Sequence, residues 1–89
     1  MPARRIRITG RVQGVFFRTE SKKMAESLRL AGWVRNLDDG SVDIHAEGDA
    51  ENLETFIAWC RRGPPAAEVD GVDSTSAEEA GYRTFDVKR

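Results

Sequence analysis

Two segments with the apolar repeat of an amphipathic helix divide this chain into short, strand-like stretches. Between residues 19 and 31, small and apolar side chains recur at helical spacing, and Gly32 stands where a C′ glycine would end the helix. A second stripe follows Asp49, a candidate N-cap, and Gly63-Pro64-Pro65 ends it. The stripe residues are Ser21, Met24, Ala25, Leu28 and Ala31, then Leu53, Phe56, Ile57 and Cys60. This pattern predicts two helices, each with one buried face.

The remaining segments show the two-residue alternation of β-strands. Residues 4–9, 33–37, 41–47 and 82–88 fit it, and Asp38-Asp39-Gly40 suits a hairpin turn. The segment 66–76 fits less well, because Val69 and Val72 are three apart, and this spacing indicates a bulge. The order of elements predicts an α+β fold, the ferredoxin-like split βαβ sandwich. We expect an antiparallel sheet of four to five strands with both helices on one face.

The chain length of 89 residues predicts a single domain spanning residues 1–89. Cys60 is the only cysteine, so no intramolecular disulfide and no cysteine-only zinc site can form. No apolar stretch has the length of a signal-peptide core or a membrane span, which favours a cytoplasmic location. The net charge is −1, but the first 35 residues carry nine basic and two acidic side chains. This asymmetry indicates that any anion site lies in the first third, although a solvated basic face would give the same pattern.

The segment from Gly10 to Arg18 interrupts the strand pattern just before the first helix. Gly10 and Gly14 allow a loop to turn its backbone N–H groups inward around an anion. The helix N-terminus adds to the attraction, and Arg18 can place a planar fork of donors on two phosphate oxygens. Spacing alone slightly favours a simpler interpretation, an ordinary strand–helix connection.

A second segment, Gly32-Trp33-Val34-Arg35-Asn36, is followed by a glycine turn. Asn36 ends the predicted strand, where an asparagine often bonds its own backbone. Together the two segments resemble the two signature segments of the acylphosphatase family, Gly-x-Val-Gln-Gly-Val-x-Phe-Arg and Gly-Trp-Val-x-Asn. They occur in the same order, and the element pattern agrees over nearly the whole chain, the stretch 66–81 excepted.

The resemblance assigns roles to particular residues. Arg18 matches the family's phosphate-binding arginine, and Asn36 matches the asparagine that holds the nucleophilic water. With Arg18, the preceding loop matches the phosphate cradle, which acts through backbone N–H groups. The loop residues are Arg11, Val12, Gln13, Gly14, Val15, Phe16 and Phe17.

The activity that the resemblance implies is hydrolysis of the carboxyl–phosphate bond of a small-molecule acyl phosphate. The leaving carboxylate has a conjugate-acid pKa of about 4, so it departs without protonation. Attack of water through a loose transition state requires mainly positioning and electrostatic stabilisation. An arginine, N–H donors and one asparagine can supply both without a metal ion or cofactor. Inorganic phosphate would be the product and a competitive inhibitor, and we expect a monomer.

The other candidate side chains have simpler interpretations. His45 is predicted on the strand face opposite Val42, Ile44 and Ala46, so it is expected at the surface or an edge rather than as a base. Cys60 and Met24 are expected in the core.

Two other functions are compatible with the predicted fold. A nucleic-acid-binding domain would stack bases on aromatic side chains of its central strands, but residues 4–9 and 41–47 contain none. A non-catalytic anion-sensing domain would keep the loop but not need both Arg18 and Asn36. We therefore expect neither nucleic acid nor membrane as a partner.

Overall fold

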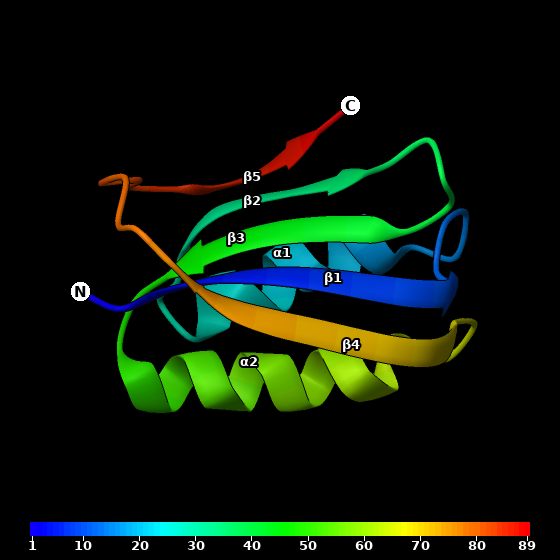
Figure 1. The fold of residues 1–89 in the computed structure, drawn as a ribbon, viewed down its shortest axis with the longest axis horizontal. Helices are drawn as coiled ribbons and strands as arrows, with labels where there is room; N and C mark the ends of the chain where they lie inside the picture. Colours follow the sequence, from blue (N-terminus) through cyan, green and yellow to red (C-terminus); the bar gives the residue numbers. More distant parts are fainter.

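The computed structural model describes residues 1–89, which form five strands and two helices. The strands are β1 (Ala3–Arg11), β2 (Ala31–Asn36), β3 (Val42–Glu47), β4 (Glu68–Ala77) and β5 (Phe85–Lys88). The helices are α1 (Phe17–Ser27) and α2 (Ala50–Arg62). The five strands form one sheet of order β4-β1-β3-β2-β5, and the two helices pack against it (Figure 1). This is the predicted ferredoxin-like α+β arrangement.

The sequence predicted an antiparallel sheet, but the sheet is mixed. The pairs β1–β3, β1–β4 and β2–β3 are antiparallel, whereas β2 and β5 are parallel. After β4 the chain crosses from one edge of the sheet to the other, as Figure 1 shows, and adds β5 to the free edge of β2. The strand runs in the same direction as β2 because it enters this edge from the end at which β2 begins, Gly32 pairing with Phe85.

One apolar core lies between the helices and one face of the sheet. Alternate residues of the central strands point into it, and the register places Ile6 opposite Ile44 and Ile8 opposite Val42. Phe56 and Cys60 reach the same cluster from α2, and Ala25 from α1. Both helices contact the side chains that point to this one face of the strands, so both helices cover the same face of the sheet. Cys60 is buried as predicted, and Met24 packs partly buried against the core.

The first helix ends earlier than predicted, and Gly32 does not end it. Arg29 takes the left-handed conformation with φ 56°, its N–H donates to Glu26 O at 3.0 Å, and the Leu30 N–H donates to Ala25 O at 2.9 Å. These two bonds are those of a Schellman motif, with arginine at the position usually held by glycine. Gly32 instead lies inside β2.

Two smaller predictions had different outcomes. The bulge is confirmed, because pairing shifts from Thr9–Gly71 to Gly10–Val69 and leaves Asp70 unpaired. Asp49 precedes α2 as predicted, but its side chain makes no capping bond.

The sheet face away from the helices carries a cluster that the sequence did not predict. His45 is 7% exposed rather than at the surface or an edge, because it lies on the central strand β3 between the rings of Trp33 and Tyr82. Its Nε2 lies 2.7 Å from Glu47 Oε2. Asp43, also on β3, binds the guanidinium groups of Arg5 and Arg35 on the two neighbouring strands. No helix of the chain is long and apolar enough to span a membrane.

Candidate active site

A hollow of about 230 Å³ opens where β1 passes into α1, beside the end of β2. The connecting loop turns sharply there, since Gly14 and Phe16 both have positive φ angles, 73° and 67°. Phe16 is the residue directly before α1, and it is 74% exposed. The loop therefore curls around the N-terminus of the helix.

Backbone donors of this loop are free to bind a ligand. No N–H from Val12 to Phe16 donates a hydrogen bond to another group of the protein. The first N–H groups of a helix also lack intrahelical partners, and the helix dipole places partial positive charge at this end. The arrangement is suited to an anion with several acceptor oxygens.

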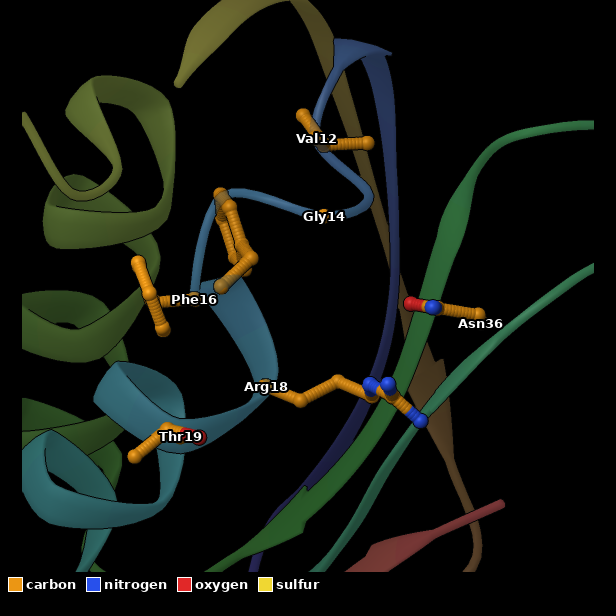
Figure 2. A pocket seen from close by; sticks show the side chains of 7 residues that line it. Val12, Gly14, Phe16, Arg18, Thr19 and Asn36 are labelled. Atoms are coloured by element: carbon orange, nitrogen blue, oxygen red, sulfur yellow. The ribbon is translucent and has the colours of Figure 1, made fainter. Parts of the chain in front are cut away.

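Arg18 supplies the full positive charge of the hollow. It lies in the first turn of α1, and Figure 2 shows its side chain extending from the helix toward the strands and Asn36. Its Nη1 is 3.5 Å from Lys88 O at the end of β5, a long contact that leaves most of the guanidinium donors available. No carboxylate lines the hollow, so nothing there competes for the guanidinium.

Asn36 stands at the opposite wall from the loop. It is the last residue of β2, and its amide faces the hollow (Figure 2). Its Oδ1 is buried and accepts no hydrogen bond from the protein. A buried, unpaired amide oxygen is costly unless a ligand or water donates to it. The site is therefore built to hold a donor at this atom.

Gln13 holds the loop in place without lining the hollow. Its Nε2 donates to Leu37 O at 2.7 Å and to Ser41 O at 2.8 Å. Both carbonyls belong to the connection between β2 and β3, directly after Asn36. One side chain thus fixes the distance between the loop and the strand that carries Asn36.

The structure brings most of the predicted site residues together. Val12, Gly14, Phe16, Phe17, Arg18 and Asn36 line the hollow. Arg11 is exposed at the end of β1, Val15 is in the core, and Gln13 contacts the hairpin. Thr19, one residue beyond the predicted set, also lines the hollow. Its position in the first helical turn, next to Arg18, was the available signal.

Comparisons with known proteins place this chain among similar sequences and structures. The acylphosphatase family model matches residues 4–87. A curated acylphosphatase of Methylococcus capsulatus is 56% identical over 66 residues, covering 74% of this chain and 72% of the relative. That of Thermotoga petrophila is 47% identical over 88 residues, covering 99% and 98%. The crystal structure of acylphosphatase from Bacillus subtilis superposes over 100% of both chains with a TM-score of 0.97 and 38% identity.

Proposed function

Because this chain belongs to the acylphosphatase family, hydrolases that act on acid anhydrides, we propose that the hollow beside Arg18 binds the phosphate of an acyl phosphate and that Asn36 positions the attacking water. Within this proposal, Arg18 and the loop N–H groups bind the phosphate oxygens. The loop spans the residues from Arg11 to Phe17. The observation that carries the proposal is the buried, unpaired Oδ1 of Asn36 across the hollow from Arg18.

The reaction breaks one P–O bond and forms another. The water oxygen attacks phosphorus while its O–H donates to Asn36 Oδ1. The bond between phosphorus and the carboxylate oxygen breaks, and the carboxylate leaves with the electron pair. The proton lost by the water passes to solvent or to the phosphate formed. The equatorial oxygens keep their charge throughout, and Arg18 and the N–H groups stabilise it.

Inorganic phosphate is the product and, in this proposal, a competitive inhibitor, because it occupies the same cradle. The residues named all come from one chain, which supports a monomer as the active form. We place that monomer in the cytoplasm, and no metal or cofactor takes part in the proposed mechanism.

Two substitutions test the division of roles. Arg18→Gln should lower kcat/KM for benzoyl phosphate at least about 10³-fold and abolish inhibition by inorganic phosphate. Asn36→Ala should lower kcat about 10²- to 10³-fold while phosphate still inhibits, because the cradle stays intact. Hydrolysis is followed as loss of substrate with time.

The matched controls are the same two types of substitution, arginine to glutamine and asparagine to alanine, made in α2. Arg61→Gln removes an exposed charge there, and Asn52→Ala removes an amide that donates to Leu28 O at 3.1 Å. Both should keep wild-type turnover. Near-normal kcat in Asn36→Ala would show that the water is held by another group.

A further inference from the structure

A second hollow of about 260 Å³ adjoins the first and shares Phe16 with it. Its walls are mostly apolar: Val15, Phe16, Pro64, Pro65 and Ala66, with Glu20 at the side. A cavity of about 150 Å³ accommodates a benzene ring, so this hollow is large enough for one ring-sized group.

Phe16 has an unfavourable backbone conformation and is largely exposed to solvent. A bulky residue with φ 67° is strained by about 1–3 kcal/mol, and Phe16 as a whole is 74% exposed, so core packing does not offset that strain. What the conformation achieves is placement of the aromatic ring between the two hollows. Strain held at such a boundary points to a contact with a ligand.

The opposite wall is rigid before any ligand binds. Pro64 to Ala67 form a β-turn in which the Ala67 N–H donates to Pro64 O at 3.0 Å. Prolines fix φ, so little conformational entropy remains to be lost on binding. Gly63, directly before this turn, lies close to the start of α1, since a Cβ on Gly63 would lie 2.9 Å from Phe17 Cε2.

The in-line geometry of the reaction places the departing acyl group on the side of this second hollow. In phosphoryl transfer the attacking and leaving oxygens lie roughly in line. With the water at Asn36, the acyl oxygen leaves toward the side away from Asn36. Figure 2 shows Phe16 across the hollow from Asn36, and neither Asn36 nor Arg18 lines the second hollow.

We propose that the hollow between Phe16 and the Pro64–Ala66 turn binds the acyl group of the substrate and selects apolar, ring-bearing acyl groups over small or acidic ones. The inference rests on the proposed function, since it needs the phosphate in the first hollow. Glu20 is half-exposed at the side of the hollow, and its partner Lys23, 3.4 Å away, is more exposed to solvent. The Glu20 carboxylate therefore disfavours an acyl group that itself carries a carboxylate.

The test compares kcat/KM for benzoyl phosphate with that for acetyl phosphate. The ratio of the two cancels any effect of a substitution on the shared phosphate group. Ala66→Asp sets a charge into the apolar wall at an exposed turn position, and it should lower the benzoyl-to-acetyl ratio about fivefold. Ala66→Val keeps the wall apolar and should preserve the ratio.

The matched control is Ala58→Asp, the same change on the exposed face of α2. It should leave the ratio at the wild-type value. An unchanged ratio in Ala66→Asp, or an equal fall in Ala58→Asp, would overturn the proposal. Failure of the proposed function looks different, because wild-type protein would then hydrolyse neither substrate.

A second experiment tests selection against acidic acyl groups. Glu20→Gln should raise kcat/KM for succinyl phosphate relative to benzoyl phosphate about two- to threefold at low ionic strength, and salt should reduce the difference. Glu54→Gln, an exposed change on α2, should leave this ratio unaltered. No rise in Glu20→Gln would remove Glu20 from the acyl site.

Discussion

At the level of single residues, the geometry of the phosphate hollow depends on a side chain outside it, Gln13. Replacing Gln13 with Met keeps its length but removes both hydrogen bonds to the hairpin. Each such bond contributes about 0.5–1.5 kcal/mol, and a loop displaced by even about 1 Å can cost 10²-fold in rate. We expect Gln13→Met to lower kcat/KM for benzoyl phosphate at least about tenfold and stability by about 1–2 kcal/mol.

Steady-state kinetics and urea denaturation of the same preparations check this prediction. Asp38→Asn is the control, because Asp38 lies exposed in the same hairpin turn and makes no side-chain hydrogen bond. Wild-type activity in Gln13→Met would mean that the loop holds its conformation without the clamp.

At this scale the two motifs predicted which residues lie together. Arg18 and Asn36, 18 positions apart, were expected to act together, and the structure places both at one hollow. Gln13 was recognised only as part of the cradle, because the carbonyls it binds belong to residues with no distinguishing side chain. The prediction for His45 was wrong because strand alternation gives its face but not what covers that face. Trp33 and Tyr82 cover it from elsewhere in the chain.

At the level of elements, local patterns predicted the strands and helices better than their ends. The bulge in β4 followed from the spacing of two valines, and the order of elements fixed the fold class. The end of α1 did not follow, because a Schellman motif with Arg29 at its left-handed position has no glycine to mark it. The parallel direction of β5 depends on a crossing of the sheet, which no local pattern records.

Gly32, which the sequence predicted as the end of the first helix, instead allows β2 to lie close to β3. It lies in β2 with φ 143°, and a Cβ there would stand 1.8 Å from His45 O on β3. The clash is with backbone, so the two strands would have to separate. We expect Gly32→Ala to destabilise the protein by more than about 3 kcal/mol, measured by urea denaturation.

A substitution at Gly40 is the control that separates the clash of an added Cβ from the strain of a positive φ. It also has a positive φ, 93°, but no atom lies within 4 Å of an added Cβ. Gly40→Ala should therefore cost only about 1 kcal/mol, the strain of the left-handed conformation. Equal losses in the two variants would show that strand contact is not the reason for Gly32.

At the level of the whole molecule, two buried carboxylates on β3 hold distant parts of the sheet together. Asp43 joins β1, β3 and β2 through Arg5 and Arg35. Glu47 accepts N–H donors from Gly81 and Tyr82 at 3.1 and 3.2 Å, and so fixes the crossing segment between β4 and β5. The sheet that presents Asn36 thus depends on charges buried away from the helices.

The pKa values of both carboxyls are lowered in the folded protein. Burial alone would raise the pKa of Asp43, but hydrogen bonds from Arg5 and Arg35 outweigh it. For Glu47, burial is likewise outweighed by hydrogen bonds from the backbone of residues 80–82 and from His45. A lowered folded pKa means that the unfolded chain binds protons first as the pH falls. The stabilisation is therefore complete above the unfolded pKa values, about 4, and is lost as the pH falls through the folded ones.

This linkage predicts how Asp43→Asn changes the acid sensitivity of the protein. At pH 7 the variant loses charged hydrogen bonds to two arginines that stay partly solvated, so we expect a loss of about 1–3 kcal/mol. Below the unfolded pKa of about 4, the unfolded wild type takes up a proton at Asp43 that the asparagine cannot take up, so the difference in unfolding free energy between the two proteins should shrink as the pH falls. Urea denaturation at several pH values measures it, in buffers without phosphate, because an anion bound only by the folded state would add stability. Asp38→Asn, at an exposed turn, should track the wild type. A difference between Asp43→Asn and wild type that stayed constant from about pH 7 to pH 2 would show that Asp43 contributes through packing and not through its charge.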